Sequence, residues 1–365
     1  MKARAVLALG ADTKSRFLIE KDRNIRFGPE IGDLGIPENY ERFEKEVKKA
    51  VRGVSLDRVA YDLHPGYFSA RFALAYFAAS GPVEYPKHSR KRPRLIPVQH
   101  HHAHIASVLE EHSLKNPVIG ICFDGTGFGA DGKMWGGEFI LADKTGFKRL
   151  AHFEYMKMPG VEKVIREPWR MALSLMGNSA FPLIKDITGK YKRVILSMCE
   201  KNINTPLTSS VGRIFDAAAA LLGICSRASY EAEGPIKLEQ ISASDVKEGY
   251  GFDTIRDKTG YVIRVKKIFL GMAGDLRKGK KKYLIAAKFH NSVVNAALLT
   301  VKRLSKDTGI KNVAVSGGVF QNKIIKTRMI KKLNSAGFAV YANDKMPAND
   351  FNISLGQYHI SRYNK

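Results

Sequence analysis

The hydrophobic positions of this chain alternate between short apolar runs, typical of buried strands, and longer stretches with helical spacing. In the first third, this pattern predicts strands over 5–9, 15–20, 58–62 and 95–98 and helices over 41–51, 68–79 and 103–111. The first two strands read as a hairpin with residues 10–14 as its turn. This part of the chain is therefore expected to form an α/β lobe, which we place at residues 1–115.

A second α/β series begins near residue 117 and fills the rest of the chain. It predicts strands over 117–124, 134–141, 147–153, 313–316 and 338–341, with helices over 283–304, 324–336 and 353–363. The first of these strands ends in a glycine-rich acidic turn, residues 124–129. We expect residues 116–365 to form a second lobe that carries a mainly helical insertion at about 156–280.

Two α/β lobes that each open with an acidic hairpin describe the duplicated fold shared by actin, sugar kinases and heat-shock ATPases. In that fold the hairpin turns hold nucleotide phosphates between the lobes, because glycine lets backbone N–H groups approach phosphate oxygens closely. The residues that suit this role are Asp12 and Lys14 in the first turn, Gly125 and Gly127 in the second, and Gly317 and Gly318 after the strand at 313–316.

Four histidines lie within five positions at the junction between a predicted strand and a predicted helix. His100 and His104 are four residues apart, so on a helix they share one face and offer two metal ligands. A surface or helix-capping cluster is the alternative that the spacing leaves open. His101 and His102 fit supporting hydrogen-bond donors or substrate contacts better than ligands.

Composition narrows the class of protein without deciding it. No apolar run approaches the roughly 20 residues of a membrane span and no signal peptide is evident, which predicts a cytoplasmic protein without a membrane partner. The three cysteines, Cys122, Cys199 and Cys225, are too far apart for a zinc ribbon. A net charge of +25 fits nucleic acid, an acidic partner or an anionic substrate. The basic clusters at 87–94, 277–282 and 323–332 contain few aromatic residues for stacking on bases.

Several motifs together resemble the carboxy-terminal, transferase part of the HypF carbamoyltransferases of nickel–iron hydrogenase maturation. They are Ala60-Tyr61-Asp62-Leu63-His64-Pro65, the histidine run 98–104, Phe123-Asp124-Gly125-Thr126-Gly127, Trp135-Gly136-Gly137-Glu138, Arg166-Glu167-Pro168-Trp169-Arg170-Met171, Gly212-Arg213-Ile214-Phe215-Asp216 and Ser316-Gly317-Gly318-Val319-Phe320-Gln321-Asn322. They cover nearly the whole chain in order. The fold is shared with transferases that modify tRNA with a threonylcarbamoyl group.

The resemblance implies a divalent iron or zinc ion on His100, His104 and Asp350, although Asp350 by itself could equally cap a helix. It also implies an adenine nucleotide, as ATP, AMP or carbamoyl-adenylate, with Mg²⁺ as a further candidate ion. The nucleotide contacts that it implies are Asp12, Lys14, Phe123, Asp124, Gly125, Thr126, Gly127, Asp216, Gly317, Gly318 and Asn322.

For catalysis the resemblance points to His64, Asp62 and Arg166. The implied reaction moves a carbamoyl group from carbamoyl-adenylate to the C-terminal cysteine of a HypE-like acceptor, as a step in cyanide ligand synthesis. Relatives carry acylphosphatase-like, zinc-binding and adenylate-forming domains, and this chain shows no cysteine pairs for them. We therefore expect a separate YrdC-like adenylate-forming domain or chain as a partner. A tRNA threonylcarbamoyl transferase and a non-catalytic nucleotide-binding scaffold are the alternatives.

Overall fold

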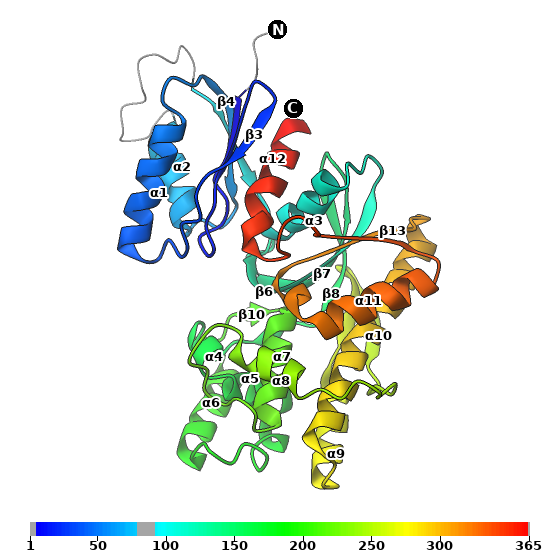
Figure 1. Ribbon diagram of the computed structural model, residues 1–365. Helices are drawn as coiled ribbons and strands as arrows, with labels where there is room; N and C mark the ends of the chain where they lie inside the picture. The colour runs from blue at the N-terminus through cyan, green and yellow to red at the C-terminus, as the bar shows by residue number, and fades with distance from the viewer. Residues whose placement is uncertain (1–4, 79–91, 364–365) are drawn as a thin grey trace.

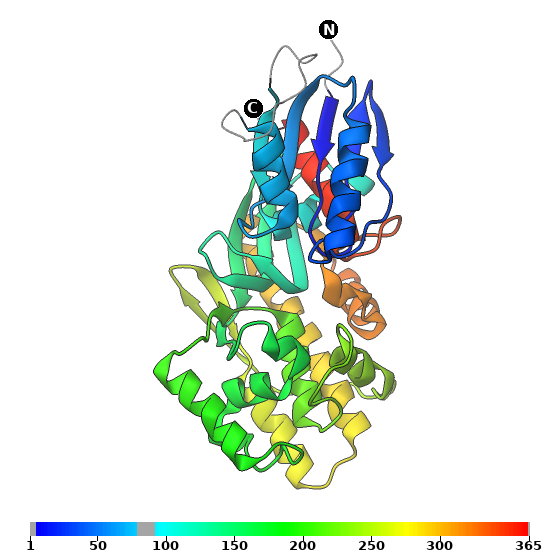
Figure 2. The same ribbon diagram turned by 90° about the vertical axis from the view of Figure 1, so that its left-hand side faces the viewer.

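The computed structural model describes residues 5–78 and 92–363, and most of the basic cluster at 87–94 lies outside these ranges. Two α/β lobes and a largely helical region are stacked along the long axis of the molecule. Figure 1 shows the first lobe in blue at one end, the second sheet in the middle and the insertion in green and yellow at the other end. The view at right angles, Figure 2, shows the same order.

The first lobe is built on a five-stranded sheet with the order β3-β2-β1-β4-β5. Its elements are β1 (Ala5–Ala8), β2 (Leu18–Lys21), β3 (Asn24–Phe27), α1 (Pro37–Ala50), β4 (Leu56–Asp62), α2 (Phe68–Phe77) and β5 (Arg94–Val98). Strands β1, β2 and β3 are antiparallel, whereas β4 and β5 run parallel to β1. The hydrophobic pattern did not predict β3, because this edge strand is almost entirely exposed.

The second lobe repeats this arrangement. Its sheet contains the order β8-β7-β6-β13-β14, with β6, β7 and β8 antiparallel and β13 and β14 parallel to β6. The elements are β6 (Val118–Phe128), β7 (Met134–Ala142), β8 (Phe147–Phe153), α10 (Lys282–Thr308), β13 (Asn312–Ser316), α11 (Lys323–Ser335) and β14 (Ala339–Ala342). Because one strand order and one set of strand directions occur twice, the predicted duplicated fold of the actin, sugar kinase and heat-shock ATPase type is confirmed.

The two lobes are joined by their last helices, α3 (His100–Glu111) and α12 (Ile353–Tyr363), which pack against one another. Helix α12 lies on the first sheet, where Ile353 and Tyr358 share a buried cluster with Val6. Helix α3 lies on the second sheet, where Ile105 packs with Val118. Figure 1 shows α12, in red, beside the blue lobe. Each sheet is thus covered by a helix from the end of the other lobe's series.

The region between β8 and α10 is less uniformly helical than its sequence suggests. Its helices are α4 (Lys163–Arg166), α5 (Trp169–Met176), α6 (Gly189–Lys201), α7 (Val211–Leu221), α8 (Glu233–Gln240) and α9 (Lys266–Arg277), and its strands are β9 (Met156–Lys157), β10 (Leu207–Thr208), β11 (Asp253–Asp257) and β12 (Gly260–Arg264). Strand β12 pairs in parallel with β8 and so extends the second sheet. Three consecutive apolar residues, Tyr261, Val262 and Ile263, form the centre of this strand.

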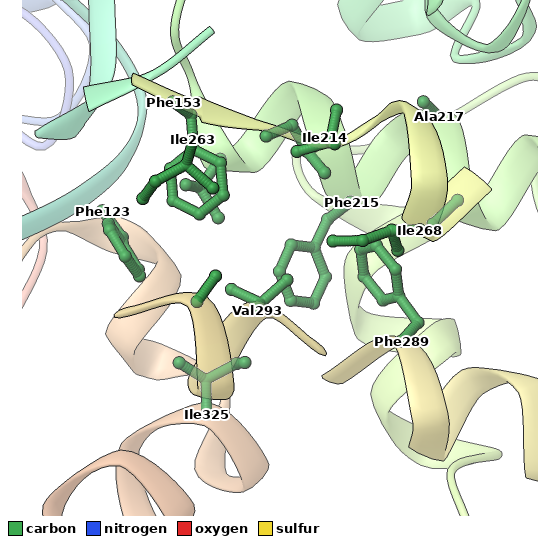
Figure 3. Close-up of a cluster of buried hydrophobic side chains, with 14 of the residues drawn as sticks. Phe123, Phe153, Ile214, Phe215, Ala217, Ile263, Ile268, Phe289, Val293 and Ile325 are labelled. Carbon is green, nitrogen blue, oxygen red and sulfur yellow. The ribbon is translucent and has the colours of Figure 1, made fainter. Parts of the chain in front are cut away.

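A continuous hydrophobic core links the insertion to the second sheet. Phe123 and Phe153 from the sheet share this core with Ile214 and Phe215 of α7 and Phe289 of α10, as Figure 3 shows. Helix α10 is long and apolar enough to span a membrane, but 72% of its apolar window is buried inside the protein. This burial explains its apolar composition, because α10 is a core helix of the second lobe.

The predicted turn at 124–129 is wrong. Strand β6 continues to Phe128, and its pairing with β7 is interrupted by a bulge between Phe123 and Gly127. The turn follows at Gly129–Gly132, where Gly132 donates to the carbonyl of Gly129. A bulge re-aims the side chains of a strand, so the acidic segment projects from the strand rather than from the hairpin tip.

Candidate functional site

The histidine run forms the first turns of α3, which begins at His100, earlier than the predicted 103. Gln99 is the N-cap, and its side-chain oxygen accepts a hydrogen bond from the backbone N–H of His102. All four imidazoles are buried, with exposed fractions of at most 4%. A surface or capping cluster is therefore excluded, since the cap is Gln99 and the imidazoles lie inside the protein.

Four side chains converge where β6, α3 and the loop before α12 meet. One ligand atom from each of His100, His104, Asp124 and Asp350 lies within 4.8 Å of the other three. Nε2 of His100 is 3.4 Å from Asp124 Oδ2 and 3.6 Å from Asp350 Oδ1, and Nε2 of His104 is 3.7 Å from the same two oxygens. The sequence assigned Asp124 to the nucleotide, but the bulge in β6 brings it into this cluster.

The hydrogen bonds behind the two imidazoles leave their inner nitrogens free. Nδ1 of His100 lies 2.8 Å from Asp62 Oδ2, and Nδ1 of His104 lies 2.9 Å from Asn352 Oδ1. Among the described residues, both Nε2 atoms are buried and without a hydrogen-bond partner. Two such nitrogens facing two carboxylates are the donor set of a divalent-cation site, and it suits Fe²⁺ or Zn²⁺ equally. The residues present therefore fit the ion that the sequence implied.

The charges of the cluster point the same way. Burial lowers the pKa of His100, but Asp62, Asp124 and Asp350 outweigh it and raise this pKa well above its usual value. Burial raises the pKa of Asp124, but His100 and His104 outweigh it and hold this pKa well below its usual value. The buried carboxylates thus retain their negative charge, which either a protonated His100 or a bound cation balances.

A cavity of about 800 Å³ borders the cluster, and Asp124 and Asp350 line it. This volume suits a ligand of nucleotide size. The first lobe contributes Thr13 and Lys14, the second contributes Gly125, Thr126, Gly318 and Asn322, and the insertion contributes Arg166, Arg213, Tyr230 and Ile236. Lys14, Arg166 and Arg213 are the cations among the described lining residues, which also include the carboxylates of Asp33, Asp124, Glu231, Glu239 and Asp350. The wall formed by residues 228–239 was not predicted, since no motif marks it.

Glycines next to the cluster leave room for neighbouring atoms that an added Cβ would overlap. A Cβ atom on Gly127 would lie 2.5 Å from Cε1 of His101 and 2.9 Å from Cδ2 of His100. A Cβ atom on Gly318 would lie 2.9 Å from Asp124 Oδ1, the atom to which the Gly318 N–H donates at 3.0 Å. Gly317, with φ +102°, packs against the Phe123 carbonyl. Gly127 and Gly317 thus shape the cluster rather than line the cavity.

Two of the predicted nucleotide residues lie elsewhere. Asp12 accepts hydrogen bonds from the backbone N–H groups of Phe68 and Ser69 at the start of α2, at 2.6 and 3.0 Å. The Phe123 ring is fully buried and stacks on Phe320, with ring centroids 5.6 Å apart. Neither side chain lines the cavity described above.

Asp216 and Asn322 lie beside the cavity with different surroundings. Asp216 is buried and paired with Arg213 at 3.0 Å, and burial raises its pKa to about 6. Asn322 lines the cavity, caps α11 and lies 3.1 Å from Nε2 of His290. Because Nδ1 of His290 donates to the Ala286 carbonyl, Nε2 accepts from Asn322. His290 thereby fixes the orientation of the Asn322 amide.

The three predicted catalytic residues do not share one site, because Asp62 and His64 lie together and Arg166 lies apart in the cavity wall. Asp62 bonds to His100 and also accepts from the backbone N–H of His64, at 2.9 Å. The half-buried His64 ring stacks on Tyr67 and does not line the cavity, and burial lowers its pKa. Arg166 is the one of the three that lines it. Asp62 therefore acts on the site through His100.

Fold and site together define a two-lobed protein of the duplicated α/β type with a buried histidine–carboxylate cluster. The family described as "Carbamoyltransferase, Kae1-like Domain, second subdomain" matches residues 120–357, and the "HypF Kae1-like domain" matches residues 1–111. The chain belongs to the HypF carbamoyltransferase family, of which it represents the Kae1-like part.

Individual relatives agree with this assignment. Carbamoyltransferase HypF2 of Cupriavidus necator is 33% identical over 98% of this chain and 46% of its own length. The Carbamoyltransferase HypF homolog of the same organism is 31% identical over 98% of this chain and 91% of its own length. A solved full-length HypF in the phosphate- and nucleotide-bound form superimposes with a TM-score of 0.90 at 36% identity, over 98% of this chain and 55% of that one. The chain thus spans about half the length of HypF2.

Proposed function

We propose that this chain transfers the carbamoyl group of carbamoyl-adenylate to the C-terminal cysteine thiol of a HypE-like acceptor and releases AMP. The observation that carries the proposal is the His100, His104, Asp124 and Asp350 cluster, whose two carboxylates line a cavity of nucleotide size. The family supports the carbamoyl chemistry. The reaction would be a step in making the cyanide ligand of nickel–iron hydrogenases, in the cytoplasm.

In this mechanism the cavity binds the adenylate between the lobes and the insertion. Lys14, Arg166 and Arg213 supply positive charge for its phosphate, and Gly125 allows its backbone N–H group to approach. The acceptor thiolate forms a C–S bond at the carbamoyl carbon while the C–O bond to the phosphate breaks, and the thiol proton passes to solvent. His100, His104, Asp124 and Asp350 would hold a divalent ion, which supplies Lewis acidity toward the phosphate or the carbamoyl oxygen.

We propose a separate YrdC-like adenylate-forming domain as the source of carbamoyl-adenylate. This part of the proposal is supported by the family matches, which are to Kae1-like domains. The net charge of +25 is the observation that favours the alternative acceptor, tRNA, on the same fold.

The deciding experiment is an anaerobic transfer assay. The chain is mixed with the HypE-like acceptor and with carbamoyl-adenylate made by a supplied adenylate-forming domain, and intact-mass spectrometry follows the acceptor. We expect a gain of one carbamoyl group that His104→Ala and Asp350→Ala abolish. His112→Ala is the matched control, because this histidine at the end of α3 bonds to the Ala342 carbonyl, away from the cluster.

Other outcomes would redirect the proposal. Label on tRNA with none on the acceptor would make the chain a tRNA-modifying transferase. Nucleotide binding without any transfer would make it a scaffold.

A further inference from the structure

Asn352 is a fully buried residue of the 3₁₀ turn that leads into α12, and no sequence motif pointed to it. Its side-chain oxygen contacts Nδ1 of His104 at 2.9 Å. Its side-chain nitrogen lies 3.0 Å from Asn343 Oδ1, 3.1 Å from the Pro347 carbonyl and 3.2 Å from Ser316 Oγ. The residue therefore joins the histidine helix to the loop that carries Asp350.

These neighbours determine which way the Asn352 amide faces. The Pro347 carbonyl only accepts hydrogen bonds, and Ser316 Oγ donates its proton to Asn343 Oδ1, so it accepts from Asn352. All three groups around Nδ2 are thus acceptors. A flipped amide would place its oxygen against these three acceptors and lose their hydrogen bonds, which costs free energy. The oxygen of Asn352 must therefore face His104.

The orientation of the amide in turn fixes the tautomer of His104. Because Asn352 Oδ1 can only accept, Nδ1 of His104 carries a proton, and in the neutral imidazole, the form that binds metal, Nε2 carries the lone pair. Nε2 lies 3.7 Å from an oxygen of Asp124 and from an oxygen of Asp350, so a cation held by these carboxylates would be within its reach.

The network continues to the loop itself. Asn343 donates from Nδ2 to Ser107 Oγ and to Glu111 Oε1, at 3.0 and 2.9 Å. Glu111 also accepts from the backbone N–H groups of Asp344, Lys345 and Met346. One face of α3, bearing His104, Ser107 and Glu111, is thus tied to the segment that leads to Asp350.

We propose that Asn352 is a positioning residue of the divalent-cation centre, which holds His104 in the tautomer that binds metal and keeps the Asp350 loop in register. The inference rests on the proposed function only in assuming that the cluster binds a cation. It extends beyond that function because it assigns tautomer control to a neutral amide, whereas His100 has the carboxylate of Asp62 in the corresponding place.

Cobalt binding tests the proposal without an activity assay. The purified chain is titrated with Co²⁺ against a competing chelator, and the visible d–d absorption reports the ligand geometry. We expect Asn352→Ala to weaken Co²⁺ binding by about 10- to 100-fold and to alter the spectrum. Asn352→Asp keeps the accepting oxygen, so it should retain binding within about 10-fold of the unaltered chain.

The matched control is Asn291→Ala. Asn291 is equally buried and donates to the carbonyls of Val246 and Glu248, far along the chain from the cluster. It should lower the thermal midpoint without changing Co²⁺ affinity. Should Asn352→Ala fail to fold, Asn352→Asp decides, because loss of binding in a folded Asp variant would show that the accepting oxygen is not what matters.

The outcomes separate this inference from the proposed function. Unchanged affinity and spectrum in Asn352→Ala would overturn the role of Asn352 and leave the cation centre standing. No Co²⁺ binding by the unaltered chain would overturn both.

Discussion

Asp12 follows the first strand of the first lobe, β1, and Asp124 lies in the corresponding strand of the second lobe, β6. Each carboxylate accepts a backbone hydrogen bond from the segment that follows the fourth strand of its lobe, which is β4 in the first lobe and β13 in the second. In the first lobe that segment supplies Phe68 N–H and Ser69 N–H, and the Ser69 hydroxyl also donates, so both oxygens of Asp12 are occupied. In the second lobe Gly318 N–H binds one oxygen of Asp124, and the other faces His100 and His104.

This difference shows how one fold element can serve structure in one copy and chemistry in the other. A serine hydroxyl and two N–H groups saturate the carboxylate of Asp12 and fix the start of α2. In the second lobe, Asp124 has fewer hydrogen-bond partners, because Gly318 supplies a backbone N–H but no side-chain hydroxyl. One oxygen of Asp124 is therefore available for a cation. The comparison predicts which substitutions destroy the site and which only weaken the fold.

The largest effect is expected from the two aspartates themselves. Asp124→Asn should lower Co²⁺ affinity by about 100-fold or more, because it removes a charged ligand, with little loss of stability. Asp12→Ala should leave Co²⁺ affinity unchanged and cost about 1–2 kcal/mol of unfolding free energy, the usual effect of losing a helix cap. Metal titration and urea unfolding of both variants test this. Loss of cobalt binding in Asp12→Ala would contradict the assignment of a structural role to Asp12 and of cation binding to Asp124.

A second, smaller effect is expected at Gly317, which precedes the N–H group that holds Asp124. Its φ of +102° favours glycine, and an added Cβ would clash with the Phe123 carbonyl. Gly317→Ala should therefore cost about 3 kcal/mol of unfolding free energy and also weaken Co²⁺ binding. Gly337→Ala is the control, since it has φ +82° but open space around its Cβ and should cost about 1 kcal/mol. Equal losses of unfolding free energy in the two variants would refute the role of the close contact between residue 317 and the Phe123 carbonyl.

The sequence predicted most of the fold because the apolar runs of both lobes are regular. The central strands and the helices around them come from buried stretches such as those of β6 and α10. Strands β3 and β11 were not predicted, because their exposed residues carry weak hydrophobic patterning. Strand β12 was also missed, since it has only three consecutive apolar residues.

For the site, the sequence grouped His100 and His104 correctly on one helix face, since a four-residue spacing fixes that geometry. It could not place Asp124 beside them, because the bulge in β6 depends on pairing with β7. It missed Asn352 because a tertiary hydrogen bond between residues 248 positions apart leaves no local signal. The helical spacing thus indicated His100 and His104 and the family resemblance supplied Asp350, whereas Asp124 and Asn352 join the site through tertiary contacts.

A third prediction concerns pH and the core of the second lobe. Burial lowers the pKa of His290 to about 4, so the folded protein binds fewer protons than the unfolded chain between pH 6.5 and 4. This contribution to stability is complete above pH 6.5 and is lost as the pH falls, by about 3 kcal/mol at pH 4. Urea unfolding between pH 7.5 and 4.5 should show a shallower loss for His290→Gln. Parallel pH profiles of the two proteins would contradict it.

The smallest effect is expected where the first lobe meets the insertion at the cavity. Lys14 pairs with Glu231 at 2.9 Å, but the Glu231 side chain is 73% exposed. Solvent screens such a pair, so Glu231→Gln should cost less than about 1 kcal/mol, and 1 M salt should remove the difference. Glu44→Gln, which breaks the exposed Lys48 pair within α1, is the matched control and should cost as little. A loss above about 2 kcal/mol for Glu231→Gln alone would mean that this contact, rather than the exchange of α3 and α12, holds the lobes together.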